Sequence, residues 1–276
     1  MALGFSRLFV AFDARAVSVA AVGGGLSAGR LQVFARVPLL PGQLLPSPSG
    51  ENVPAPDGVR DALRRAVEAA GRGAGRATLV LPDGIARLVL VPLPAAADPR
   101  DYVRFRLGAS LPWPASEAVV EALPAGRARV VGAAVRRGIV AEYERIAASA
   151  GLLPERVHLA PLLAIESLRS RQRDGAHVVL GDTAGCFVVL RAGGVEALSS
   201  RRRDGSAGEA RRLLAEAGRV ARLAGLGDAT VTFSGSDAER LRSEAGVPGE
   251  GRLTAPAHQV EAAEAAEAAW LPGAVA

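Results

Sequence analysis

The sequence predicts an α/β fold built from two similar halves. Two stretches, "FVAFDARAVSVAAVGGGLSAGRLQVFARV" at 9–37 and "HVVLGDTAGCFVVLRAGGVEALSSRRR" at 177–203, each have the pattern of three strands joined by tight turns. An aspartate ends the first strand of each stretch, and we expect Asp13 and Asp182 to hold the same place. Two β-meanders that each open an α/β half indicate an internal duplication with a cleft between the halves.

The predicted halves have unequal sizes. We expect the first half over residues 1–176, including a small α/β insert at about 77–135, and a leaner second half over 177–276. With 276 residues and 49% hydrophobic residues, the chain can bury one large core or two modest ones.

The charge of the chain is basic but dispersed. All 33 basic residues are arginine, the net charge is +5 and the sequence pI is about 10.6. The arginines are scattered among acidic residues and only 4% of residues are aromatic, which argues against nucleic-acid binding. The densest cluster, Arg201 to Arg203, is expected to be a solvated strand end.

The cysteine and histidine content excludes several kinds of site. A single cysteine, Cys186, cannot form an intramolecular disulfide, and three scattered histidines do not give a common zinc spacing. We expect Cys186 to be a small buried residue, and His158 and His177 to pack or face solvent. The apolar run near the N-terminus is too short for a signal segment or a membrane span, so we expect a cytoplasmic chain that reaches a membrane only through partners.

The segments of the first half are predicted as follows. Residues 38–58 form an exposed Pro/Gly/Ser loop, and Asp57 caps a helix that follows it. Two strands around Asp83-Gly84, at 77–94, form a hairpin. We also expect a helix from Asp98 that ends before Pro112, strands near 117–123 and 128–135, and then a helix, a glycine stop, a short strand and another helix up to about 169.

The second half is predicted to continue with a helix over 206–225, a buried strand at 229–235 and a helix beginning near Asp237. A short strand "RLTAP" and the alanine-rich helix "QVEAAEAAEAAW" complete it. The "GGG" at 23–25 is expected to be a hairpin turn.

The order of these segments resembles the actin-like (ribonuclease H-like) fold of the type IV pilus assembly protein PilM, which is related to FtsA and to the cytoplasmic domain of GspL. The segments that resemble this family are the opening meander, "LPDGIARLVLVPLP", "LGASLPWP", "VVGAAVRRGIVAEYERIAASAGLLPERV", "LGDTAGCFVVLRAGG" and "FSGSD". Their order and spacing produce the resemblance, since no single motif is specific.

The resemblance implies the positions of a nucleotide site. In nucleotide-binding members, two strand turns hold the phosphates and acidic residues hold water around magnesium. The matching positions in this chain, which we treat as a degenerate cofactor site, are Asp13, Asp182, Thr183, Gly185, Ser234 and Gly235.

This chain departs from that pattern. Ala14 follows the first aspartate where glycine is expected, Ala16 and Val17 replace short hydroxyl residues, and the chain has no lysine. One helix replaces the helical subdomain that the resemblance implies between Arg203 and Asp228. We therefore expect no cofactor, with ATP and magnesium bound weakly or not at all. The alternative to a nucleotide-binding role is that Asp13 and Asp182 each only form hydrogen bonds with the turn that follows them.

The resemblance implies a non-catalytic cytoplasmic adaptor, peripheral at the inner membrane, in a type IV pilus or type II secretion platform. Its partner would be the cytoplasmic tail of a bitopic protein like PilN, held by strand addition in a groove between the insert and the first core subdomain. The alternative is an actin-fold ATPase or a sugar or acid kinase. The predicted partner-binding residues are Tyr102, Phe105, Arg106 and Trp113, although Phe105 and Trp113 can instead be core residues.

Overall fold

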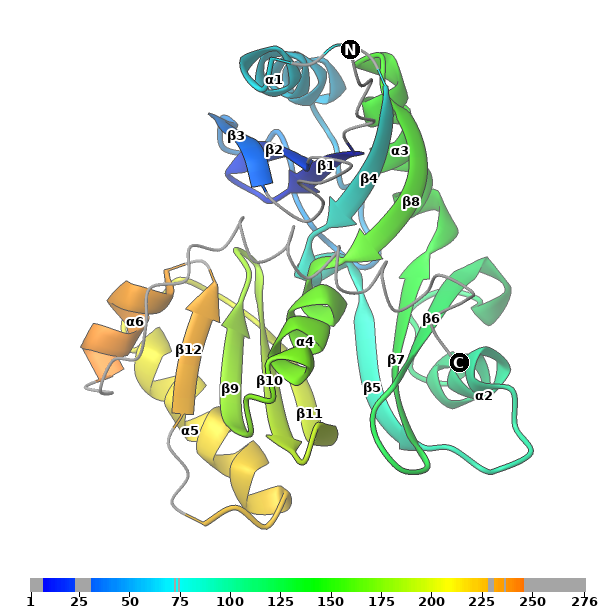
Figure 1. Cartoon of the computed structure of the whole chain (residues 1–276), viewed down its shortest axis with the longest axis vertical. Helices are drawn as coiled ribbons and strands as arrows, with labels where there is room; N and C mark the ends of the chain where they lie inside the picture. The colour runs from blue at the N-terminus through cyan, green and yellow to red at the C-terminus, as the bar shows by residue number, and fades with distance from the viewer. Residues whose placement is uncertain are drawn as a thin grey trace. The chain divides into compact units, whose positions relative to one another are not determined.

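The computed structural model describes residues 7–22, 31–71, 73, 75–227, 231–235 and 237–245 (Figure 1). The chain divides into two compact units. Among the described residues, unit 1 comprises 7–82 and 139–167, and unit 2 comprises 83–138 and 168–245. The division predicted near residue 176 concerns the duplicated halves and stays a prediction.

Unit 1 contains the first predicted meander. Its five strands lie in the order β3-β2-β1-β4-β8, with β1, β2 and β3 antiparallel and with β4 and β8 parallel to β1. The residues of β1 and β2 are buried in consecutive runs, so both faces of these strands are covered, and α1 packs against β2 and β3. The elements are β1 (Arg7–Phe12), β2 (Ala16–Val22), β3 (Leu31–Pro38), α1 (Pro56–Ala69), β4 (Arg76–Leu81), α3 (Arg137–Ser149), β8 (Leu153–Leu159) and α4 (Ala160–Ser170); α3 and α4 each cross a unit boundary.

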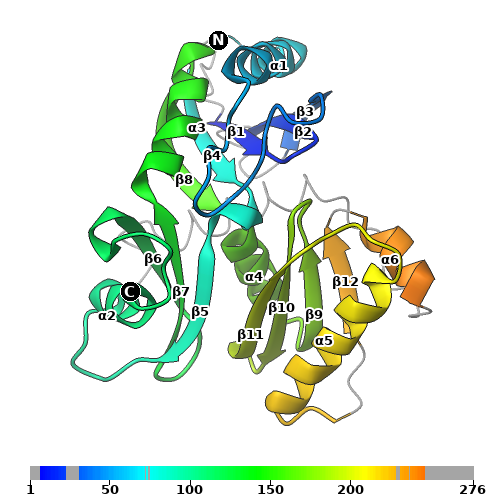
Figure 2. The same cartoon turned by 180° about the vertical axis from the view of Figure 1, so that it is seen from behind.

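Unit 2 contains the second meander and repeats the first four strands of unit 1. Its main sheet has the order β11-β10-β9-β12, with the meander antiparallel and β12 parallel to β9. Helix α5 packs on this sheet, as Figure 2 shows. The elements are β9 (Gly175–Leu180), β10 (Ala184–Arg191), β11 (Gly194–Arg202), α5 (Glu209–Leu223), β12 (Val231–Gly235) and α6 (Ala238–Ala245).

The predicted insert forms a second, smaller sheet in unit 2. Three antiparallel strands lie in the order β5-β7-β6, and α2 packs against all three. Helix α2 begins beside Asp98 as predicted, and Asp98 is its N-cap, since its side chain accepts a hydrogen bond from the Asp101 N–H. The elements are η2 (Asp83–Ile85), β5 (Arg87–Pro92), α2 (Pro99–Gly108), η3 (Ala115–Glu117), β6 (Ala118–Pro124) and β7 (Arg129–Arg136).

The hairpin predicted around Asp83-Gly84 is wrong. Strand β4 is buried along most of its length and pairs with β1 and β8, so both of its edges are taken. Strand β5 therefore cannot pair with β4, and it joins the smaller sheet beside β7. The Asp83–Ile85 segment is a 3₁₀ turn, and the Asp83 side chain is buried.

The expectation that residues 38–58 are simply exposed is also wrong. Leu44, Asn52 and Val53 are buried. The Asn52 side chain donates to the carbonyl groups of Ser47 and Gly50 and accepts from the Tyr143 hydroxyl group at 3.2 Å. These bonds satisfy the amide group in the interior, so the loop packs onto α3.

Smaller differences concern helix ends and strand ends. Asp57 lies inside the first turn of α1, where it pairs with Arg60, and the N-cap residue is Ala55. Arg201 and Arg202 are exposed as expected for a solvated strand end, but Arg203 is buried. Cys186 is buried as predicted.

Some predictions lie outside the described residues. These are the "GGG" turn, the "RLTAP" strand and the alanine-rich helix near the end of the chain. Every helix in the described part of the chain is too short or too polar to cross a membrane.

Candidate functional site

The two meander turns that could face phosphates are each closed by an equivalent backbone hydrogen bond, but the residues that correspond are not the ones that the sequence indicated. In the first turn the Asp13 N–H donates to the Ala16 carbonyl at 3.0 Å, and in the second the Gly181 N–H donates to the Ala184 carbonyl at 2.9 Å. Asp13 is therefore equivalent to Gly181, and Asp182 lies one residue further along. The expectation that Asp13 and Asp182 hold the same place is wrong, because Gly181 takes the place of Asp13 in the second turn and Asp182 takes the place of Ala14.

The first turn is closed by its own aspartate. One carboxylate oxygen of Asp13 accepts the N–H groups of Arg15 at 2.9 Å and Ala16 at 2.7 Å, and the other pairs with Arg36 at 3.2 Å. The N–H groups of residues 13, 15 and 16 are thus all bonded within the meander. A phosphate-binding loop needs such groups turned toward the ligand, so these three do not fit a bound phosphate.

The second turn, Gly181 to Thr183, faces a carboxyl group that the sequence analysis missed. A Cβ atom on Gly181 would lie 2.1 Å from Asp83 Oδ2, so only glycine leaves room for the Asp83 side chain. The Thr183 hydroxyl group donates to Asp83 Oδ1 at 3.4 Å, and Asp83 Oδ2 is buried without a hydrogen bond from any described residue.

The environment of Asp83 favours its neutral form. Burial, together with the nearby charge of Asp182, raises its pKa to about 7, against the hydrogen bonds from Gly84 and Thr183 and the charge of Arg203. An acidic group so close to the second turn is unfavourable for a phosphate, because above pH 7 it becomes an anion.

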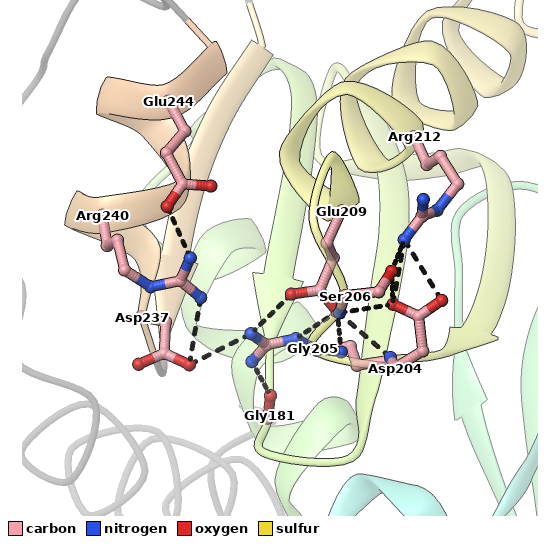
Figure 3. Close-up of polar contacts among 10 residues, drawn as sticks. Gly181, Asp204, Gly205, Ser206, Glu209, Arg212, Asp237, Arg240 and Glu244 are labelled. Atoms are coloured by element: carbon pink, nitrogen blue, oxygen red, sulfur yellow. Dashed lines mark hydrogen bonds and ion pairs between the residues drawn. The ribbon is translucent and has the colours of Figure 1, made fainter.

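A buried guanidinium group lies against the same turn. The Arg203 side chain is only 3% exposed; it pairs with Glu209 at 3.2 Å and with Asp237 at 3.1 Å, and it donates to the Gly181 carbonyl group. Figure 3 shows Glu209, Asp237 and Gly181 arranged around this guanidinium group. Because three partners surround it, this guanidinium group is committed to internal contacts.

The remaining predicted cofactor residues lie in strands or at strand ends, where they take part in the pairing of the sheet. Gly185 lies in β10 and pairs with Leu180 and Arg201. Ser234 and Gly235 end β12, and Gly235 has a φ of +95°. A Cβ atom there would lie 2.1 Å from the Leu180 carbonyl oxygen, so this glycine permits the close approach of β12 to β9. Asp182, Thr183, Ser234 and Gly235 thus gather at one end of the unit 2 sheet, whereas Asp13 belongs to unit 1.

The predicted partner-binding residues differ in exposure. Phe105 is 77% exposed on α2, which argues against the core alternative for this residue, and Arg106 beside it is exposed. Tyr102 is half-buried against the core of the smaller sheet. Trp113 is 7% exposed and its indole N–H has no hydrogen-bond partner among the described residues, which fits the core alternative.

Neither Asp83 nor Arg203 was predicted to lie at the site. Asp83 was assigned to a hairpin turn and Arg203 to a solvated strand end. Neither position carries a local sequence signal for burial, since Asp83 precedes a glycine as turn residues do, and Arg203 stands among Arg201, Arg202 and Asp204. No three histidine, cysteine or acidic side chains of the described residues form a group that could hold a metal ion.

Comparisons with known proteins relate the whole architecture to solved structures. No family model matches the sequence, and a search of the curated proteins finds no match. A chain of the PilM-PilN type IV pilus biogenesis complex superimposes with a TM-score of 0.64 and 19% identity, covering 87% of this chain and 86% of that one. A Bacteroides thetaiotaomicron protein with an actin-like ATPase fold and unknown function superimposes with a TM-score of 0.55 and 11% identity, covering 87% of this chain and 86% of that one.

This chain has the actin-like fold. The cytoplasmic domain of EpsL, an inner membrane component of the type II secretion system of Vibrio cholerae, gives a TM-score of 0.56 at 12% identity, covering 95% of each chain. The actin-like fold accounts for the repeated order of the two main sheets and for the meander turns at their ends. In this chain a single described helix, α5, joins β11 to β12.

Proposed function

We propose that this chain is a non-catalytic adaptor of a type IV pilus or type II secretion platform, which binds the cytoplasmic tail of a bitopic inner-membrane protein. The observation that supports it most is the likeness to a chain of the PilM-PilN complex over 87% of this chain. The internal bonding of the Asp13 turn supports the non-catalytic part of the proposal.

The surroundings of the second turn also favour this function over an ATPase or kinase. The buried Asp83 carboxyl group and the committed Arg203 guanidinium group leave little room or positive charge for a triphosphate. Phosphoryl transfer depends on groups that hold and neutralise the transferred phosphate. We therefore expect no ATP turnover.

The exposed side of α2 is the surface that we assign to the partner tail. Phe105 and Arg106 give an aromatic and a cationic anchor of the kinds that dominate binding energies. Among the described strands, β6 pairs only with β7, so its outer edge can receive an extended peptide by strand addition. Trp113 is buried, so we assign it to the support of this region and not to direct contact.

The test is binding of a synthetic peptide that copies the cytoplasmic tail of the PilN-like protein of the same organism. By fluorescence anisotropy, Phe105→Ala and Arg106→Ala should each weaken binding about thirtyfold, with unchanged melting temperature. The matched control is Arg104→Ala, which removes a neighbouring exposed arginine that pairs with Asp101. Equal losses in all three variants, or no binding by the unmodified protein, would contradict the proposal.

Calorimetry with Mg-ATP tests the alternative function. Micromolar binding that is lost in Asp182→Ala, or any turnover above that of a buffer control, would favour the ATPase or kinase. We expect neither.

A further inference from the structure

The end of β11 and helix α5 concentrate most of the net charge of the chain. Residues 199–226 contain seven arginines and three acidic residues, a net charge of +4, whereas the whole chain has +5. All of these arginines except Arg203 are exposed. We call the exposed set the basic face; its members are Arg201, Arg202, Arg211, Arg212, Arg219 and Arg222.

Helical periodicity separates the two signs of charge on α5. At 100° per residue, its four arginines fall within an arc of about 100°. The acidic residues of this helix, Glu209 and Glu216, are buried and lie just beyond one edge of this arc, about 40–60° from Arg212. Every exposed charged residue of α5 is therefore an arginine.

Some of these arginines are partly neutralised and others are not. Glu216 accepts from Arg219 at 2.6 Å and from Arg201 at 3.0 Å, and Arg212 pairs with Asp204 at 2.9 Å. Arg211 and Arg222 form no ion pair with any described residue. They lie 20° apart in the arc, on either side of the small residues Ala215 and Gly218. Nothing on the helix shields these two charges from a large anionic surface.

An exposed apolar residue adjoins the arginines. Leu223, the last residue of α5, is 71% exposed and lies next to Arg222. A basic amphipathic surface with an exposed leucine is suited to the interface of an anionic membrane, where the arginines meet headgroups and the leucine enters the acyl boundary.

We propose that the basic face binds the anionic phospholipid headgroups of a membrane surface. The occupant follows from charge complementarity and from what the face lacks: residues 199–226 contain no aromatic residue on which a nucleic-acid base could stack. This contact is independent of the partner tail, and it goes beyond the expectation that the chain reaches a membrane only through partners. A tail-binding partner would strengthen it by holding the chain near the bilayer.

The test is co-sedimentation of the full chain with phosphatidylcholine vesicles, with and without about 30% phosphatidylglycerol. We expect binding only to the anionic vesicles, and release as NaCl rises from about 50 mM to about 300 mM. The double variant Arg211→Gln with Arg222→Gln should weaken binding about thirtyfold, since each charge near such a surface changes affinity about fivefold. At about 50 mM NaCl, Leu223→Ser should also weaken binding to the anionic vesicles, because it removes the side chain that enters the acyl boundary.

The control variant changes the net charge by the same amount elsewhere. Arg65 on α1 and Arg127 in the β6–β7 turn are exposed and form no ion pair with a described residue. Arg65→Gln with Arg127→Gln should therefore leave vesicle binding within about twofold of the unmodified protein. Equal losses in the two double variants, or no binding to anionic vesicles, would overturn the proposal. Tighter binding to single-stranded DNA than to vesicles, lost with Arg211 and Arg222, would also overturn it.

Discussion

The carboxyl group of Asp83 occupies the space that a side chain at position 181 would need. A Cβ atom on Gly181 would lie 2.1 Å from Asp83 Oδ2 and 2.3 Å from its Cγ. This contact joins the start of the smaller sheet to the β9–β10 turn within unit 2. It makes the glycine a packing requirement and not only a turn residue.

Replacing Gly181 by alanine should therefore destabilise the protein by about 1–3 kcal/mol, because the buried Asp83 side chain has to move. Urea unfolding measures the change. Gly138→Ala is the control: no atom lies within 4 Å of the added Cβ atom and φ is not positive, so stability should be unchanged or slightly higher. In a double-mutant cycle, Asp83→Ala should remove part of the cost of Gly181→Ala; additive effects would show that the two positions are not coupled.

The raised pKa of Asp83 predicts a pH dependence of stability. The folded protein binds the proton more tightly than the unfolded chain, whose pKa is 3.8, so this residue lowers stability as pH rises from about 4 to about 7. The loss is of order 4 kcal/mol. Asp83→Asn should raise the melting temperature at pH 8 and change it little at pH 4. A gain of equal size at both pH values would contradict this assignment.

Arg203→Met should destabilise the protein by about 3–5 kcal/mol, because it leaves the carboxylates of Glu209 and Asp237 without their buried partner. The matched control is Arg202→Met, at the exposed neighbouring position, which should change the free energy of unfolding by less than about 0.5 kcal/mol. Chemical denaturation of both variants at pH 7 compares them. A small change at Arg203 would mean that Glu209 and Asp237 find solvent or new partners.

Asn52→Ala should cost about 2–3 kcal/mol, since it strips the Tyr143 hydroxyl group and two carbonyl groups of their hydrogen-bond partner. Ser49→Ala, at an exposed position of the same loop, should be nearly neutral. Thermal melting of the two variants provides the measurement. Deletion of most of residues 38–58 should now be strongly destabilising, and an unchanged melting temperature would show that the buried part of the loop is dispensable.

The elements of the fold were largely predictable, since local patterns determine them. The apolar runs around Val10 and Val188, and the Asp98-Pro99 helix start, predicted strands and a helix that the structure contains. The pairing of β4 was not predictable from its own residues. Its second edge pairs with β8, which follows the insert in the sequence. A local Asp-Gly pair predicts a hairpin but cannot show that a later strand occupies the edge that the hairpin needs.

The candidate site was less predictable, because its contacts join residues far apart in the sequence. Asp83 meets Thr183 across 100 positions of the sequence, and Arg203 meets Asp237 across 34. The shift of Asp182 relative to Asp13 depends on one glycine in the turn. The basic face was not predicted from the sequence for another reason. Its arginines are dispersed among acidic residues along the chain, and only the helical repeat separates the exposed Arg211 from the buried Glu216.

The interrupted connectivity of unit 1 has a consequence for its synthesis. Strand β4 emerges from the ribosome before the insert, whereas β8, which pairs with its second edge, emerges after it, roughly 70 residues later. At about 5–20 residues per second, the edge of β4 stays unpaired for about 4 to 14 seconds on the nascent chain. An unpaired apolar edge is a site where other chains can add. The length of the insert therefore sets the period during which the nascent protein is most exposed to aggregation and has most need of a chaperone.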